Sequence, residues 1–373
     1  MRYDISAKLY IFLFPLNDNS SIISPMKRPW YLSVFFWLIL LSEMGFAKKR
    51  SYISWDDLEV ESEKLHGRNA GKKGVIIVDK NGKGDCLTVQ AAVDMVPHHN
   101  LERIKIHILP GLYSEKVHVP ATKPYISFIG DPEKADATVI AWHDKASSVD
   151  ENGAEIGTFG SASVTVESDY FCAAGITFQN TVQFHAGARG NQAVAFRISG
   201  DHSVLYKSRF IGSQDTLLDE TGTHFFFKCM VQGSIDFIFG NARSLYKECS
   251  LSVVGQSFAI AAQRRQSGND DGVFSFVNCT VHGAGAVFLG RAWGEYSRII
   301  YAYSELDIDV KPQGWDDWGK PSRQKTVLFG EYMCRGKGAD RSGRVAWSKA
   351  LTRQEAQPYL DSTFIAAKQW LRL

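Results

Sequence analysis

Two aspartates and two glutamines recur at a nearly constant interval in the middle of the chain. Gln214 follows Gln192 after 22 residues, and Asp236 follows Asp215 after 21 residues, each beside a short run suited to a strand. Two carboxylates brought close together do not stabilise a fold, because like charges repel and the pKa of one of them rises. Such a pair suits proton transfer or nucleophilic attack, so these four residues are candidates for a catalytic site.

A short unit of an aromatic, a polar and a small residue repeats at the same interval. Its final residues lie 21, 20 and 30 residues apart, and no long stretch with a helical period intervenes. Repeats of this length, built from short strands and glycine-bearing turns, are typical of a β-solenoid in which each repeat is one coil. The copies are residues 206–208, 227–229, 246–249 and 276–279. We therefore predict an all-β solenoid that brings the two aspartates to neighbouring parallel strands, about 4.8 Å apart.

Five segments resemble, in order and spacing, the signature blocks of plant pectin methylesterases. They are GLYSE at 111–115, QAVAF at 192–196, QDTL at 214–217, DFIFG at 236–240 and LGRAW at 289–293. The resemblance extends from about Gly74 to the C-terminus. It implies a right-handed parallel β-helix with a short capping helix and a C-terminal helical segment. The activity it implies is hydrolysis of galacturonate methyl esters in pectin, with release of methanol.

The resemblance also implies a role for each candidate catalytic residue. Asp236 would attack the ester carbonyl, while Asp215 would protonate the leaving methoxide and later activate water. Gln192 and Gln214 would donate hydrogen bonds to the oxyanion. Arg291 would hold Asp236 ionised and oriented through a charge-assisted pair. The sequence contains no Gly-x-Ser-x-Gly elbow, so the main signature of a serine hydrolase is missing.

Aromatic residues of the matching segments are expected to line a sugar groove. The resemblance assigns this role to Phe159, Phe239, Trp293 and Trp315. Trp318 lies in the same loop as Trp315, and the sequence leaves its role open between sugar stacking and core packing. One departure from the family pattern is Leu218, where the family usually has Tyr, so one sugar subsite is expected to differ.

Other interpretations of the same residues remain open. A hydrolase or lyase that cleaves the pectin chain could share the solenoid and use carboxylates, but it would create new chain ends instead of methanol. In a catalytically silent protein that binds wall polysaccharide, Asp236 would only cap a turn. Methanol release and reducing ends distinguish the three classes.

Composition limits the choice of partners. The formal net charge is +2, which shows no footprint of nucleic-acid binding, and 45% of the residues are hydrophobic, enough for a long core. The cysteines lack close pairing and the 10 histidines are scattered, so we expect no metal and no cofactor. The expected partners are methyl-esterified pectin and a proteinaceous pectinesterase inhibitor, and we expect a monomer.

The N-terminal region has the order of a secretory signal. Residues 26–47 begin with Lys27 and Arg28, continue with an apolar run of 12 residues and end in small residues at Ala47. We expect residues 1–25 to be an extension from a misassigned start, 48–73 a linker and 74–373 the catalytic domain. The mature protein would then be extracellular, in the cell wall.

Several local features complete the expectations. Thr88 is a plausible N-cap of a helix over 89–96, residues 111–115 form a structural turn and strand, and residues 352–371 form an amphipathic helix on the outside. The six cysteines are compatible with disulfides in a secreted protein. The family favours a Cys249–Cys279 bridge, with Cys229 as a competitor. Asn278 begins a glycosylation sequon.

Overall fold

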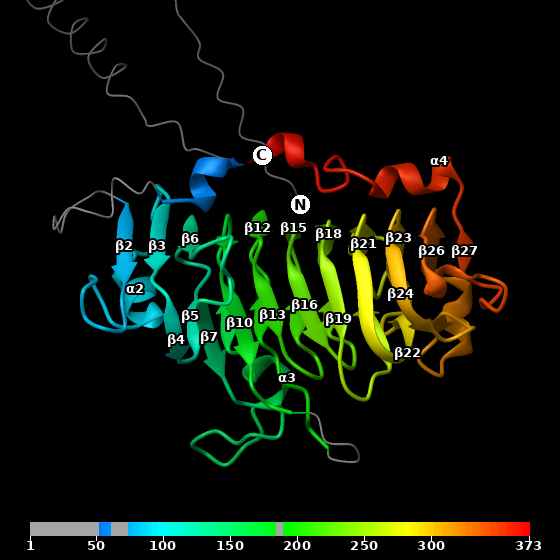
Figure 1. The fold of residues 1–373 in the computed structure, drawn as a ribbon, viewed down its shortest axis with the longest axis horizontal. Coiled ribbons are helices and arrows are strands. Elements are labelled where there is room, and N and C mark those ends of the chain that lie inside the picture. Colours follow the sequence, from blue (N-terminus) through cyan, green and yellow to red (C-terminus); the bar gives the residue numbers. More distant parts are fainter. Residues whose placement is uncertain (1–51, 61–73, 184–188) are drawn as a thin grey trace, which may run out of the picture. The chain divides into compact units, whose positions relative to one another are not determined.

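The computed structural model describes residues 52–60, 74–183 and 189–373. Within these residues the strands stack coil upon coil along one axis (Figure 1). Their pairings are parallel, and residues about one sequence repeat apart are partners, as Leu217 and Ile238 are. The structure is therefore the parallel β-helix that the sequence predicted.

Each coil contributes strands to three faces. The first sheet consists of β2 (Val75–Val78), β3 (Ile104–Ile108), β6 (Ile126–Ile129), β9 (Cys172–Ala174), β12 (Ser203–Tyr206), β15 (Thr223–Phe227), β18 (Arg243–Lys247), β21 (Val273–Val277), β23 (Arg298–Ala302), β26 (Leu328–Tyr332) and β27 (Lys349–Ala350). The second face consists of β4 (Gly111–Ser114), β7 (Thr138–Trp142), β10 (Thr177–Asn180), β13 (Arg209–Ile211), β16 (Met230–Gly233), β19 (Ser250–Val253), the start of β22 (Thr280–Ala292) and β24 (Glu305–Val310).

The third face carries the candidate site. It consists of β5 (Val117–Val119), β8 (Val164–Val166), β11 (Phe196–Ile198), β14 (Leu217–Asp219), β17 (Ile238–Gly240), β20 (Ala259–Gln263), the end of β22 and β25 (Trp315–Asp316). The long strand β22 pairs with β19 on the second face and with β20 on the third. The two faces are thereby joined in one sheet.

One residue in each of six successive coils turns the chain from the first sheet toward the second face. It directly follows a strand of the first sheet and has a positive φ between 45° and 55°. These residues are Lys207, Lys228, Glu248, Asn278, Tyr303 and Met333. The small residue that follows is buried in the corner, as Ser208, Cys229 and Cys249 are. The repeated unit found in the sequence is thus the corner of the coil.

Stacked aromatic rings fill much of the interior. The ring of Tyr246 lies 4.4 Å from that of Phe226 and 4.8 Å from that of Phe276, and the ring of Phe276 lies 4.6 Å from that of Tyr301. Each ring comes from the next coil, and each of these residues is fully buried. Contacts of this kind stabilise the stack beyond the burial of apolar area, which fixes the coils relative to each other.

A short helix covers the N-terminal end of the stack, as predicted. Helix α2 (Val89–Met95) begins after Thr88, whose hydroxyl accepts a hydrogen bond from the Ala91 N–H at 3.2 Å. The Glu115 carboxylate accepts from the N–H groups of Val89 at 2.8 Å and Gln90 at 2.9 Å. An acidic group at a helix N-terminus satisfies donors that have no partner within the helix. The structural interpretation of segment 111–115 is therefore confirmed.

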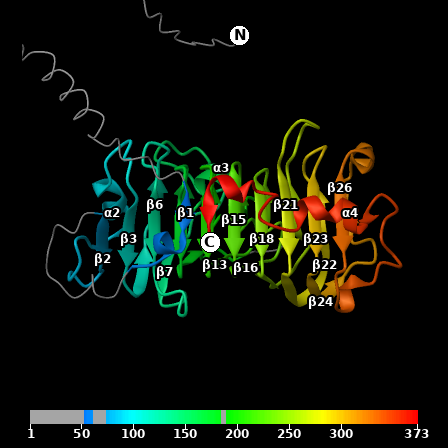
Figure 2. The same cartoon turned by 90° about the horizontal axis from the view of Figure 1, so that it is seen from above.

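The outer face of the first sheet is covered by both ends of the described chain (Figures 1 and 2). Strand β1 (Ile53–Ser54) pairs with β28 (Leu371–Arg372), and η1 (Trp55–Leu58) follows β1. Ile53 is fully buried and Leu58 is 2% exposed. The prediction of a linker over 48–73 is therefore wrong for residues 52–60, which are packed because their apolar side chains bury against the sheet.

The C-terminal segment is also less helical than predicted. It forms only the short turns α4 (Arg353–Ala356), η5 (Gln357–Tyr359) and η6 (Ala367–Gln369) before β28. Pro358 has no N–H to continue α4, and the Asp361 carboxylate accepts from the Thr363 N–H at 2.8 Å, which favours a turn. The remaining short helices are α3 (Gly157–Gly160), η3 (Pro321–Lys325) and η4 (Lys337–Ala339).

Several expectations concern residues outside this core. The extension at 1–25 and the signal segment at 26–47 lie outside the described residues. Cys249 and Cys279 lie on adjacent coils in the interior, but the predicted bridge between them is not formed, and each thiol donates to a backbone carbonyl. Asn278 is exposed at the corner beside them. In the described part of the chain no helix is long and apolar enough to cross a membrane.

Candidate active site

Asp215 and Asp236 occupy the corner where successive coils enter the third face. Asp215 lies just before β14 and Asp236 just before β17, and both have a positive φ, of 63° and 47°. Because Leu217 pairs with Ile238, the two aspartates are equivalent residues of adjacent coils. Left-handed backbone is unfavourable for residues with a side chain, although Asp tolerates it, and such strain concentrates at functional sites.

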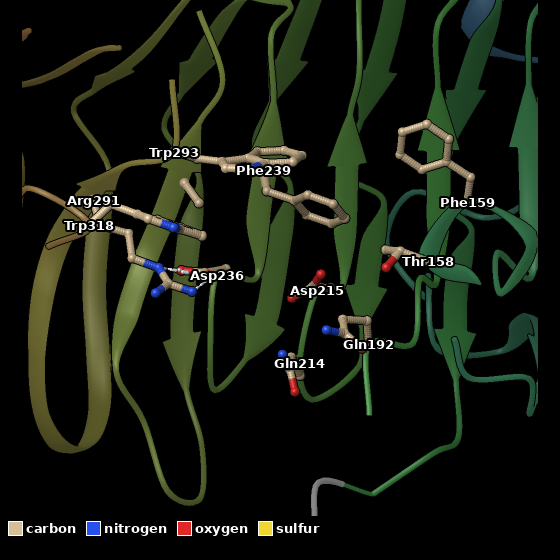
Figure 3. A pocket seen from close by; sticks show the side chains of 11 residues that line it. Thr158, Phe159, Gln192, Gln214, Asp215, Asp236, Phe239, Arg291, Trp293 and Trp318 are labelled. Carbon is tan, nitrogen blue, oxygen red and sulfur yellow. Dashed lines mark hydrogen bonds and ion pairs between the residues drawn. The ribbon is translucent and has the colours of Figure 1, made fainter. Parts of the chain in front are cut away.

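Arg291 binds one of the two carboxylates. Its Nε donates to Asp236 Oδ1 at 2.8 Å and to Oδ2 at 3.0 Å, and a terminal nitrogen also donates to Oδ2 (Figure 3). The guanidinium also contacts two rings, with its carbon 3.7 Å from the centroid of Trp318 and 5.1 Å from that of Phe258. A planar cation held in this way orients a carboxylate and favours its ionised form.

The surroundings of the two carboxyl groups affect their pKa values differently. Asp215 is 9% exposed and Asp236 is 5% exposed. Burial and then the charge of Asp236 raise the pKa of Asp215 well above its ordinary value. Burial raises the pKa of Asp236 as well, but Arg291 opposes that rise. On titration, Asp236 therefore loses its proton first, and Asp215 keeps its proton beside an ionised neighbour.

Gln192 and Gln214 lie together on one side of the carboxylates (Figure 3). Gln214 directly precedes Asp215 in the chain, and both side chains line the same pocket. On the other side of the carboxylates lie the rings of Phe239 and Trp293. The site therefore has amide donors on one side and apolar rings on the other, with the carboxyl groups between.

The five predicted catalytic residues line one open pocket of about 280 Å³. Its walls include side chains from successive coils, so the pocket follows the axis of the solenoid. The lining residues are Thr158, Phe159, Gln192, Gln214, Asp215, Asp236, Phe239, Ala262, Arg291, Trp293 and Trp318. Sequence reasoning missed Thr158 and Ala262, which carry no motif signal because small residues are common in turns and strands.

The two tryptophans of the loop after β24 differ from each other in position. Trp315 does not line the pocket but is 1% exposed in the interior, where its ring lies 4.7 Å from that of Phe329 and its Nε1 donates to Glu331. The expectation that Trp315 stacks on sugar is therefore wrong. Trp318, whose role the sequence left open, lines the pocket in its place.

The floor of the pocket is a small apolar cluster. Phe239 belongs to it and is 3% exposed, while Phe237 is fully buried in the interior, so these rings two residues apart face opposite sides of the wall. The chain therefore bends at this point. Leu218 belongs to the same cluster and is 1% exposed, directly beside Phe239 in the next coil.

A parallel β-helix with a buried carboxylate pair in an open, aromatic-lined groove has the construction of an enzyme that acts on a sugar polymer. Comparison with known proteins agrees. The Pectinesterase family model matches residues 75–368. Pectinesterase QRT1 of Arabidopsis thaliana is 52% identical over 345 residues, covering 87% of this chain and 91% of the relative.

Two further comparisons extend this likeness. Probable pectinesterase 8 of Arabidopsis thaliana is 41% identical and covers 80% of this chain and 76% of its own length. The solved structure of pectin methylesterase from carrot is similar with a TM-score of 0.72 at 32% identity, covering 82% of this chain and 96% of the carrot protein. The chain belongs to the pectinesterase family, and it is a carboxylic ester hydrolase that removes methyl esters from pectin.

Proposed function

We propose that Asp236 is the nucleophile and Asp215 the general acid and base of this ester hydrolysis. A carboxylate oxygen of Asp236 attacks the carbonyl carbon of a galacturonate methyl ester, and the amides of Gln192 and Gln214 bind the resulting oxyanion. When the intermediate collapses, the bond between carbon and methoxy oxygen breaks. Asp215 gives its proton to the departing oxygen, which leaves as methanol.

The second half of the reaction restores the enzyme. The product of the first half is a mixed anhydride between Asp236 and the galacturonate. Asp215, now ionised, takes a proton from water as the water oxygen attacks the acyl carbon. The bond to Asp236 then breaks, which returns the ionised Asp236 and the protonated Asp215. The galacturonic acid carboxyl group that is released loses its remaining proton to water.

The observation that supports this assignment is the asymmetry of the pair. Arg291 binds Asp236 through several hydrogen bonds, whereas Asp215 receives no ion pair in the described residues and has the more strongly raised pKa. A nucleophile has to be ionised and a general acid has to be protonated at the same pH, and the two surroundings favour that combination.

The test is methanol release per folded molecule in matched variants. Asp236→Asn should abolish the reaction, because an amide of the same shape does not attack. Asp215→Asn should lower the rate by about 10² to 10⁴ and Gln214→Ala by about 10² to 10³. The exposed Asp309→Asn is the control and should retain full activity. Full specific activity in folded Asp236→Asn would rule out the assignment.

Release of new reducing ends tests the alternative activities. If this chain cut the pectin backbone, reducing ends would accumulate with turnover. If it were a silent wall-binding protein, neither methanol nor reducing ends would appear. We infer methanol alone, because the paired carboxylates and the family match both favour ester hydrolysis over attack on the glycosidic bond.

We also propose that the protein is secreted into the cell wall, acts as a monomer and is subject to a proteinaceous pectinesterase inhibitor. Secretion rests on the signal pattern at residues 26–47. N-terminal sequencing of the protein from a plant host should find a mature chain that begins near residue 48. A mature chain that retains residues 30–41 would contradict secretion by signal cleavage.

A further inference from the structure

Asp316 is an acidic residue beside the active site that the proposed mechanism does not use. It lies on β25, where it pairs with Arg291 of β22. Trp315, the residue before it, is buried in the interior, and side chains alternate along a strand. Asp316 therefore points outward, on the same side of the wall as Arg291. Since Asp316 does not line the catalytic pocket, it can act on the reaction only through its neighbours.

One of these neighbours is Trp318, whose backbone Asp316 holds. The Trp318 N–H donates to Asp316 Oδ1 at 2.9 Å, and Trp318 has a positive φ of 64°. Left-handed backbone is unfavourable for a residue with a large side chain. An Asp two residues earlier stabilises such a turn by accepting a hydrogen bond from it. The Asp316 carboxylate therefore fixes the place from which the Trp318 ring projects.

The Trp318 ring in turn contacts the arginine that binds the nucleophile (Figure 3). The guanidinium carbon of Arg291 lies 3.7 Å from the ring centroid, and Arg291 Nε donates to both carboxylate oxygens of Asp236. A ring at this distance attracts the planar cation and favours one orientation of its hydrogen-bonding fork. Asp316 is thereby connected to Asp236 through two successive contacts, first with Trp318 and then with Arg291.

Asp316 also acts on Asp236 through its charge. The ionisable groups that influence the catalytic carboxylates are Arg291, Asp316 and the two aspartates themselves. Burial raises the pKa of Asp236 most, Arg291 lowers it, and the negative charge of Asp316 adds to the rise. Asp316 thus offsets part of the effect of Arg291, so it contributes to the pH at which Asp236 ionises.

We propose that Asp316 is a positioning residue for the nucleophile, which holds Trp318 against Arg291 through its Oδ1 atom and opposes the charge of Arg291 at Asp236. This inference rests on the proposed function, since it deepens the account of how the nucleophile is held. Arg291 binds Asp236 directly, whereas Asp316 acts from the next coil. The neighbouring Asp317 has no comparable role, because its hydrogen bonds go to Gly319 and Gln324.

Two substitutions separate the hydrogen bond of Asp316 from its charge. Asp316→Asn keeps an oxygen that accepts from the Trp318 N–H and removes the charge, whereas Asp316→Ala removes both. Asp317 offers the matched control, because its Oδ1 accepts from the Gly319 N–H at 2.9 Å in the same loop. Asp317→Asn and Asp317→Ala therefore make the same two changes one residue further along the chain.

The first measurement is kcat/KM for methanol release per folded molecule over a series of pH values. Its acid limb reports the ionisation of the free enzyme. On that limb Asp316→Asn should retain a fraction of its plateau activity about twofold to fivefold larger than the wild type does, because Asp236 stays ionised to lower pH. At neutral pH Asp316→Ala should have a kcat/KM about threefold to tenfold below that of Asp316→Asn, because only the alanine releases Trp318.

The Asp317 variants should keep the acid limb of the wild type and should differ from each other less than the Asp316 variants do. An unchanged acid limb in Asp316→Asn would overturn the inference. So would an equal kcat/KM in Asp316→Ala and Asp316→Asn, or the same pattern of losses in the Asp317 pair, which would show that the loop has a structural role alone.

A second measurement distinguishes this inference from the proposed function because it needs no turnover. The titration of the Asp236 carboxyl is followed by carbon-13 NMR, with the signal assigned by its absence in Asp236→Asn. Its midpoint should lie at lower pH in Asp316→Asn than in the wild type or in Asp317→Asn. A lowered midpoint together with full methanol release by Asp236→Asn would contradict the proposed function alone. An unchanged midpoint together with an inactive Asp236→Asn would contradict the inference alone.

Discussion

Replacing either buried aspartate by asparagine is expected to shift stability in opposite directions. The two substitutions are the same chemical change at equivalent corners of adjacent coils. Asp236 is bonded to Arg291, whereas Asp215 is paired with no cation of the described residues. We expect Asp215→Asn to stabilise the fold at neutral pH and Asp236→Asn to destabilise it.

The direction of the stability change in Asp215→Asn follows from the pKa of the Asp215 carboxyl group. Its pKa is raised well above the ordinary value of 3.8, by burial first and by the charge of Asp236 second. Because the pKa is higher in the folded state, the protonated Asp215 favours folding. This contribution is complete below the pKa of the unfolded state and is lost as the pH rises through the pKa of the folded state. Asparagine does not ionise, so the gain from Asp215→Asn should be absent in acid and grow with pH. Each unit of the pKa difference contributes about 1.4 kcal/mol to that gain.

The size of the stability loss in Asp236→Asn follows from the Arg291 side chain that the substitution leaves without its partner. Arg291 is 21% exposed and would lose the carboxylate partner that it has among the described residues, although its guanidinium still lies 3.7 Å from the ring centroid of Trp318. Hydrogen bonds to a charged group contribute about 1.5 to 3 kcal/mol each, and partial exposure lets water replace some of them. Burial also raises the pKa of Asp236, so removing its charge offsets part of this loss. We therefore expect a net loss of about 2 kcal/mol in the free energy of unfolding at neutral pH.

Urea unfolding of the wild type and both variants, followed by near-ultraviolet circular dichroism at a series of pH values, measures both effects. The difference between Asp215→Asn and the wild type should rise from near zero at about pH 4 to a clear gain at about pH 8. Asp309→Asn, at an exposed position, is the control for loss of an acidic group. The reasoning is refuted if Asp215→Asn destabilises the fold at every pH, or if Asp236→Asn is as stable as Asp215→Asn.

Three further predictions concern residues around the site. Trp315→Ala should lower the free energy of unfolding by about 3 to 5 kcal/mol, whereas Trp293→Ala should chiefly raise KM, and urea unfolding with steady-state kinetics separates the two. His224→Gln should destabilise the fold by about 3 kcal/mol in acid, because it breaks a buried pair with Asp219 at 2.6 Å. Burial lowers the pKa of His224, but the neighbouring Asp219 has the larger opposite effect, so the pKa is raised overall. The stability that protonated His224 contributes is therefore lost as the pH rises through this raised pKa, and the stability of the wild type should fall toward that of the variant. Leu218→Tyr should change the ranking of partly esterified substrates more than kcat, and equal rates on every methylation pattern before and after would count against it.

The sequence predicted the coils well because each coil repeats the same corner. The residue with positive φ and the small buried residue after it recur at fixed spacing, and register then follows from counting along the chain. The same counting placed Asp215 beside Asp236, since equivalent residues of adjacent coils are neighbours. The sequence could therefore predict the features that depend on the coil interval, namely the strand register and the neighbouring positions of the two aspartates.

Side-chain direction was harder to predict where strands are short. Trp315 and Trp318 lie three residues apart in one loop, and only the pairing of Gly290 with Trp315 and of Arg291 with Asp316 shows which of them faces inward. The C-terminal segment was predicted as a helix from its apolar pattern, which does not register the missing N–H of Pro358.

The central claim is that Asp236 becomes acylated during turnover, and a chemical trap tests it most directly. Enzyme mixed with methyl-esterified oligogalacturonate is quenched during the first turnover in hydroxylamine, which attacks the mixed anhydride at either of its carbonyl carbons. Peptide mass spectrometry then locates any hydroxamate formed on the protein. The mechanism predicts hydroxamate at Asp236 in the wild type and none when the substrate carries no ester. Hydroxamate at Asp215 would contradict it. So would methanol release with hydroxamate neither at Asp236 nor on the galacturonate beyond the amount formed without enzyme.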